Sequence, residues 1–263
     1  MDRWRGRWAV VTGASAGIGR AMAEELAASG VHLVITARRG DRLEQLAQTL
    51  RFDHGIQAET VTADLESPRG PGEIFAFTQM KGLAVDLLVN NAGVGSYGEF
   101  YRSDLLSQIG IVKLNCQAVV HLTHLFLPAM IERQGGDILI VASTAAFQAV
   151  PYSATYAASK AFDLLFAEAL AEEVERHGVR VCALCPGPTE SDFHAVSGVP
   201  SHVGPAIEPA RRVARVGLEA LANGRHSVVS GFKGWLGVQV QRAVSRRTVT
   251  GAAEKLLRPE HLR

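Results

Sequence analysis

Cysteine is scarce in this 263-residue chain, and so is an excess of either charge. The three cysteines, Cys116, Cys182 and Cys185, are an odd number, which fits a reducing compartment better than a disulfide framework. Cys182 and Cys185 form a C-x-x-C, but the segment VRVCALCPG has the pattern of a buried strand, so we expect a structural role. The 27 basic and 26 acidic residues leave a net charge of +1, which argues against a nucleic-acid partner.

Long apolar runs are also missing. The start, MDRWRGRW, is too polar for a secretory signal, and no run nears the roughly 18 residues of a membrane span. We therefore expect a cytoplasmic protein without a membrane span. Residues 211–263 are strongly basic, with 11 Lys and Arg against 3 Asp and Glu. A solvated helix face explains this best, and contact with a membrane surface or an acidic partner is the weaker alternative.

Short β-branched segments alternate with longer segments of helical periodicity. The expected strands are apolar nearly throughout, as in a parallel sheet covered on both faces; they lie at 8–12, 32–37, 57–62, 85–90, 137–142, 179–185 and 226–230. Helical patterns cover 17–29, 40–53, 70–81, 103–133, 152–177 and 208–223. This order predicts one α/β domain over residues 1–263, doubly wound, with a mainly parallel seven-stranded sheet and helices on both faces. We expect 188–207, rich in Pro, Gly and Ser, to be a substrate loop, and 232–263 to be a basic extension.

The first expected strand leads directly into TGASAGIGR, residues 12–20. Gly13, Gly17 and Gly19 stand between a strand and a helix, where a tight turn and a close pyrophosphate both require residues without a Cβ. The helix start offers free N–H groups and a positive dipole end to phosphates. Positions 18–20 are Ile, Gly and Arg, which excludes a nucleotide-triphosphate loop. A tight turn without a ligand is the structural alternative.

The second expected strand ends in ITARRGDRL. Arg38 and Arg39 stand where a carboxylate would bind the ribose of NAD, and their guanidinium groups suit a phosphate instead. Cations are unfavourable at a helix start, so an anionic ligand explains them better than ordinary surface charge does. We expect NADP(H) as the cofactor, with Arg38 as the main contact of the 2′-phosphate and Arg39 as a residue that could point to solvent.

The segment STAAFQAVPYSATYAASK, residues 143–160, has the residue types for proton transfer. Tyr156 and Lys160 are four residues apart and share a helix face. A phenol has an unperturbed pKa near ~10, and a cation within ~4–6 Å favours the phenolate. Lys160 would therefore lower the pKa of Tyr156 and make it a usable general acid and base. Ser143, at the end of a strand, could orient the substrate oxygen. Tyr152 lies further back, at the substrate end or in a structural role.

Together these motifs resemble the short-chain dehydrogenase/reductase family, over nearly the whole chain. The matching motifs are TGxxxGxG from Thr12, NNAG from Asn90, Ser143 with Tyr156-x-x-x-Lys160, and Pro186-Gly187. The resemblance implies a Rossmann fold and hydride transfer between NADP(H) and a carbonyl or secondary alcohol. It implies that Lys160 also holds the nicotinamide ribose and that Asn115 anchors a water, which makes the catalytic set Asn115, Ser143, Tyr156 and Lys160. The cofactor-binding set is Gly13, Ser15, Gly17, Ile18, Gly19, Arg38, Arg39, Asp64, Leu65, Asn91, Ala92, Gly93, Tyr156, Lys160, Pro186, Gly187 and Thr189.

The small-molecule substrate is less defined. Ser143, Phe147, Tyr152 and Phe193 are the expected contacts, in a partly apolar pocket. No metal is expected, because the H-x-x-H at 121–124 has no third ligand nearby in sequence. A catalytically inactive NADP(H)-binding regulator or scaffold is one alternative function, and epimerisation or dehydration on the same frame is another.

The segment AASKAFDLLFAEALAEEV is apolar around most of its circumference. The sheet can cover only one side of such a helix, so we expect a second subunit on the other side. The family resemblance agrees, and it implies a homodimer or homotetramer joined through 103–133 and 152–177. In the alternative, residues 232–263 fold over this helix.

Overall fold

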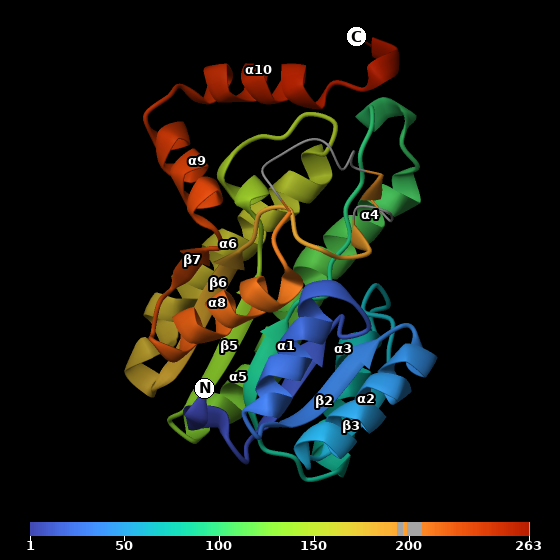
Figure 1. The fold of residues 1–263 in the computed structure, drawn as a ribbon, viewed down its shortest axis with the longest axis vertical. Coiled ribbons are helices and arrows are strands. Elements are labelled where there is room, and N and C mark those ends of the chain that lie inside the picture. Colours follow the sequence, from blue (N-terminus) through green and yellow to red (C-terminus); the bar gives the residue numbers. More distant parts are fainter. Residues whose placement is uncertain (194–196, 199–206, 263) are drawn as a thin grey trace.

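Seven parallel strands form the centre of the protein (Figure 1). The structure is a computed structural model and describes residues 1–193, 197–198 and 207–262. The sheet order is β3-β2-β1-β4-β5-β6-β7, and every pairing between these strands is parallel. The predicted α/β class is therefore confirmed, and the sheet is wholly rather than mainly parallel. The strands are β1 (Trp8–Thr12), β2 (His32–Ala37), β3 (Ala58–Thr62), β4 (Val85–Asn90), β5 (Gly136–Val141), β6 (Val179–Cys185) and β7 (Ser227–Val229).

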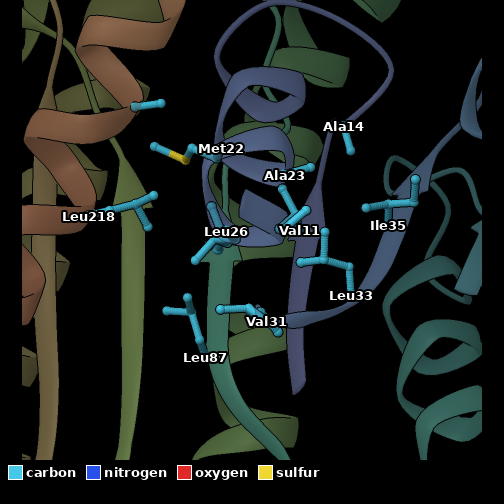
Figure 2. Close-up of a cluster of buried hydrophobic side chains, with 14 of the residues drawn as sticks. Val11, Ala14, Met22, Ala23, Leu26, Val31, Leu33, Ile35, Leu87 and Leu218 are labelled. Carbon is cyan, nitrogen blue, oxygen red and sulfur yellow. The ribbon is translucent and has the colours of Figure 1, made fainter. Parts of the chain in front are cut away.

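Helices cover both faces of the sheet, as the continuous apolar strands predict. On β1, Val11 packs into one core with helices α1, α2 and α8, whereas its neighbour Val10 packs into the other with α3, α5 and α6. Figure 2 shows part of the first core, where Ala23 and Leu26 of α1 lie beside Val11 and Met22 points toward Leu218. The helices are α1 (Gly17–Ala28), α2 (Gly40–His54), α3 (Gly70–Met80), α5 (Ala118–Glu132), α6 (Ala154–Val174) and α8 (Ala210–Ala222).

The helix expected at 103–133 contains a π-helical turn. It consists of α4 (Leu105–Val112), the turn Lys113–Gln117 and α5. The pattern of apolar residues does not reveal this turn, because one extra residue barely shifts the helical face. By length and composition alone, Leu105–Glu132 could cross a membrane, with a mean hydropathy of 1.3. Many of its apolar residues pack in the core, and a core helix passes the same test of length and composition.

The basic C-terminal extension folds into two helices, α9 (Phe232–Arg242) and α10 (Arg246–Leu257). They lie at the end of the molecule to which the strands point (Figure 1). Two hydroxyls fix α10: Tyr97 donates to the carbonyl of Leu257 at 2.5 Å, and Tyr152 donates to Glu254 at 2.7 Å. The two helices of the extension are therefore held next to the carboxyl ends of the strands.

These helices do not cover the outer face of α6. Phe162 and Leu165 of that helix remain 39% and 65% exposed. The alternative that residues 232–263 fold over this face is therefore wrong for the part of the extension that the structure describes. Most of the expected substrate loop at 188–207 lies outside the described residues.

Candidate active site

A cavity of about 1210 Å³ opens at the carboxyl ends of the strands. This is the edge at which doubly wound sheets bind their ligands. Of the predicted cofactor-binding residues, all except Gly19 line the cavity. Gly19 lies beneath the loop, where an added Cβ would collide with the side chain of Asn91 and the carbonyl of Gly13. The sequence motifs thus meet in one place.

The backbone of the glycine loop lines the cavity and is packed so closely by neighbouring segments that only residues without a Cβ fit there. Gly17 has φ +55°, and a Cβ there would come 2.7 Å from the Cβ of Ser191. Gly13 has φ +66°, and its Cβ would lie 2.8 Å from Nδ2 of Asn91. Thr12 ties this loop to the end of β4, because its Oγ1 accepts hydrogen bonds from the main chain of Asn91 at 2.9 Å and of Ala92 at 3.0 Å. The cradle at the start of α1 therefore fits a pyrophosphate.

The two arginines after β2 both reach the cavity. Arg38 donates to Glu66 at 3.2 Å, and Arg39 donates to Ser15 of the glycine loop at 3.1 Å and to Asp192 at 3.1 Å. Arg39 thus bridges two walls of the site, and the expectation that it could point to solvent is wrong. Half-exposed pairs of this kind are weak, so a 2′-phosphate can compete with the carboxylates for both guanidinium groups.

Tyr156, Lys160 and Ser143 all line this cavity. Lys160 is buried, and its ammonium donates to the carbonyl of Val141 at 2.7 Å and to Asp163 at 2.9 Å. The ring of Tyr156 lies one turn earlier on α6 and packs against that of Phe193, with centroids 5.2 Å apart. All three predicted residues are thus at one cavity, and their catalytic roles stay a prediction.

Ser143 sits just beyond β5 and begins a short 3-10 helix. Its hydroxyl oxygen accepts a hydrogen bond from the main chain of Ala145 at 3.1 Å. This bond uses an acceptor site and leaves the hydroxyl proton for another partner. Ser143 can therefore donate to an oxygen in the cavity.

Asn115 occupies the π-helical turn and is fully buried. Its side chain accepts from the main chain of Val94 at 3.0 Å and donates back to the carbonyl of Val94 at 2.9 Å. A third bond, at 2.9 Å, reaches Ser159 on α6. The side chain of Asn115 thus positions the loop after β4 against α6 and does not line the cavity.

Two predicted substrate contacts are revised. Phe147 packs against the core beneath the site, and the main cavity's lining does not include it. Tyr152 is also outside that lining, because α6 begins only at Ala154 and Tyr152 sits in a turn with φ +64°. Its hydroxyl holds Glu254 of α10 instead. Ser143 and Phe193 do line the cavity.

The wall formed by α9 and α10 was missed by the sequence analysis. Val249, Ala252, Ala253 and Leu256 repeat at helical spacing, and this was the available signal. Apolar residues of both helices and of the segment between them line the cavity: Leu236, Val238, Val240, Val244, Val249, Ala252, Ala253, Leu256 and Leu257. This part of the site therefore has an apolar surface that no recognised motif specifies.

Cys182 and Cys185 lie on β6 and are buried free thiols. Burial raises the pKa of each to about 12, so both stay protonated. A strand position and an unreactive thiol fit the structural role that the sequence predicts.

The chain belongs to the short-chain dehydrogenase family. The family model "short chain dehydrogenase" matches residues 7–198. Among curated relatives, very-long-chain 3-oxoacyl-CoA reductase of Bos taurus is 36% identical over 187 residues, which cover 70% of this chain and 59% of the relative. The chain thus matches about three fifths of that relative's length. The Anas platyrhynchos protein of the same name is 34% identical over 88% of this chain and 75% of its own length.

Solved structures agree with this assignment. A 7beta-hydroxysteroid dehydrogenase superposes with a TM-score of 0.86 at 25% identity, covering 95% of this chain and 98% of its own. A short-chain dehydrogenase from Sphingobium yanoikuyae, in complex with NADPH, has a TM-score of 0.81 at 25% identity and covers 90% of this chain and 94% of its own. L-sorbose reductase from Gluconobacter frateurii, complexed with NADPH and L-sorbose, has a TM-score of 0.78 at 28% identity, covering 88% and 98%. The fold and the sequence therefore both place the chain in the short-chain dehydrogenase family.

Proposed function

We propose that this protein reduces the carbonyl group of a large, mainly apolar substrate to a secondary alcohol. The observation that carries the proposal is the single cavity in which Tyr156 and Ser143 meet the apolar side chains of α9 and α10. A cavity of about 1210 Å³ exceeds the roughly 300–1,000 Å³ of common ligand pockets, which suits a cofactor together with a sizeable substrate.

The polar groups have distinct tasks in this reaction. When bound, NADPH supplies the hydride. Ser143 donates a hydrogen bond to the substrate oxygen and holds the carbonyl beside the phenol. Tyr156 gives its proton to that oxygen as negative charge develops. Lys160 favours the phenolate that remains, and its ammonium also holds the nicotinamide ribose.

The substrate class comes from the apolar wall and from the relatives. A 3-oxoacyl thioester has a ketone close to a polar head and an apolar chain that can lie along α10. The names of two relatives refer to such substrates, which favours this class over sugars. Leu256 and Val249 offer that chain an apolar surface.

A spectrophotometric assay tests the proposal. Purified protein is mixed with NADPH and a panel of 3-oxoacyl thioesters, bulky ketones and sugars, and loss of the reduced nicotinamide is followed. We expect turnover with thioesters or bulky ketones, and mass spectrometry should detect the corresponding alcohol. Turnover confined to sugars would contradict the proposed substrate class.

The same assay separates the alternative of an inactive NADP(H)-binding regulator. Such a protein would bind NADPH, yet it would consume none with any member of the panel. Tyr156, Lys160 and Ser143 in one cavity favour turnover, because a binding module needs no general acid. An epimerase or dehydratase would convert its substrate without net consumption of NADPH.

We also propose that the protein is a cytoplasmic homodimer or homotetramer of single-domain subunits. Apolar side chains remain exposed on α4 and α6, the two helices that the sequence analysis expects at the interface: Leu105, Leu106, Ile109, Val112, Phe162 and Leu165. A second copy of the chain would cover this face through a two-fold contact.

A further inference from the structure

A buried carboxylate lies behind the site, and the mechanism above does not use it. Asp163 is on α6, one turn after Lys160, and has 0% exposure. Its Oδ2 accepts a hydrogen bond from the ammonium of Lys160 at 2.9 Å. Its Oδ1 is buried and has no hydrogen-bond partner among the described residues. Most side chains on this face of α6 are apolar, so an ionised group here is costly unless a charge balances it.

Lys160 is the group that balances the charge of Asp163, because the two thiols near this carboxylate are neutral. Cys116 faces it from the π-helical turn, and burial together with Asp163 raises the pKa of that thiol to about 11. Cys185 on β6 is the other nearby thiol, which burial keeps protonated, with Glu168 of α6 beyond it. Neither thiol carries charge at neutral pH.

Lys160 in turn depends on this carboxylate. Burial alone would lower the pKa of Lys160, but the charge and hydrogen bond of Asp163 raise it above the ordinary lysine value. The carbonyl of Val141 takes a second N–H of the ammonium at 2.7 Å. The third N–H is left for the cavity that Lys160 lines.

We propose that Asp163 is a positioning residue that keeps the buried Lys160 ammonium charged and aims its remaining N–H at the cofactor. The inference rests on the proposed role of Lys160 and adds a fourth side chain to Ser143, Tyr156 and Lys160. Asp163 acts through Lys160 alone, because it does not itself line the cavity.

NMR of the side chains tests this without turnover. The chain has only five lysines, so a protein labelled with ¹³C-lysine gives few Cε resonances, and Lys160→Arg identifies the relevant one. In the wild-type protein this resonance should titrate above the ordinary value of a lysine side chain. In Asp163→Asn it should titrate at least about one pH unit lower, because burial then acts unopposed.

A binding measurement provides the second readout. At pH 9, Asp163→Asn should bind NADPH several-fold more weakly than the wild-type protein, whereas at pH 6 the difference should be smaller because Lys160 is charged in both. A folded variant with an unshifted Lys160 resonance would show that Asp163 only packs. If the variant does not fold, the wild-type titration decides, since a Lys160 resonance that titrates below the ordinary lysine value overturns the proposal. Neither result depends on whether the proposed substrate is correct.

Discussion

The two sides of the cavity are specified in different ways. The cofactor side is formed by backbone, in the glycine loop and at the strand ends, and an added Cβ at Gly13 or Gly17 would collide with neighbouring atoms. The opposite side is formed by side chains of α9 and α10, such as Val249 and Leu256. On that side, a Cβ added at Gly237 or Gly251 would meet no other atom within 4 Å.

This difference suggests a division of labour. Backbone geometry tolerates little change, so the residues that form it recur at fixed spacing and determine the cofactor and the chemistry. Apolar walls accept exchanges of similar volume at little cost, so they are free to determine the substrate. Substitutions on the first side should affect turnover or cofactor binding, and those on the second side should affect selectivity.

The largest effect is expected at the phenol. Tyr156→Phe should lower turnover by ~10²–10⁴-fold, the usual contribution of a general acid or base, and leave NADPH binding nearly unchanged. Stopped-flow or steady-state consumption of NADPH measures the loss, with the exposed Tyr101→Phe as a matched control. A variant with turnover within a few-fold of wild type would remove Tyr156 from the mechanism.

The next effect is expected at the 2′-phosphate. Arg38→Ala and Arg39→Ala should each weaken NADPH binding by roughly 10–100-fold, as expected for loss of a charge-assisted hydrogen bond worth about 1.5–3 kcal/mol. Binding of NADH should stay the same. Fluorescence titration compares the two cofactors, and Arg7→Ala, at the opposite end of β1, is the control. Equal losses for NADPH and NADH would indicate a general disturbance of the site instead.

A smaller effect is expected on the apolar wall. Leu256→Glu places a charge in the cavity lining at a position that is 59% exposed, so the fold should survive. KM for a long 3-oxoacyl thioester should rise about tenfold, in line with the loss of part of a buried leucine contact, whereas KM for a short one should not change. Phe232→Glu, which is exposed and outside the lining, is the control. A fall in NADPH affinity would contradict the proposed division between the two walls.

The smallest direct effect on the site is expected from the subunit interface. Leu165→Glu on the exposed face of α6 should dissociate the proposed oligomer, and turnover should fall a few-fold as the helix that carries Tyr156 and Lys160 loses its support. Sedimentation at micromolar concentration measures the mass, and Phe52→Glu, exposed on α2, is the control. A wild-type mass near 28.2 kDa would show that the single chain is the working unit.

Much of the cofactor side could be predicted from sequence for a physical reason. The strands are apolar on both faces, and the glycines stand where a Cβ would collide with Asn91 or Ser191. Both features leave a local pattern in the sequence. Gly19 was assigned to the cofactor although it serves packing, because a glycine is needed for either purpose.

The rest depends on contacts between distant segments. Tyr152 bonds to Glu254, 102 positions further along, and no local pattern connects them. Arg39 was expected to be the more solvent-directed arginine, but its partner Asp192 comes from a segment 153 positions away. Asp163 lies in a mainly apolar helix, and its sequence position does not indicate a role. Only its hydrogen bond with Lys160 in the structure does.

One measurement tests the central claim most directly. The wild-type protein is assayed with NADPH against 3-oxoacyl thioesters of increasing chain length, and kcat/KM is determined for each. If the cofactor side performs carbonyl reduction and α9 and α10 receive the chain, kcat/KM should rise with length while kcat stays nearly constant. Stable binding of NADPH without turnover of any thioester or bulky ketone would contradict the claim.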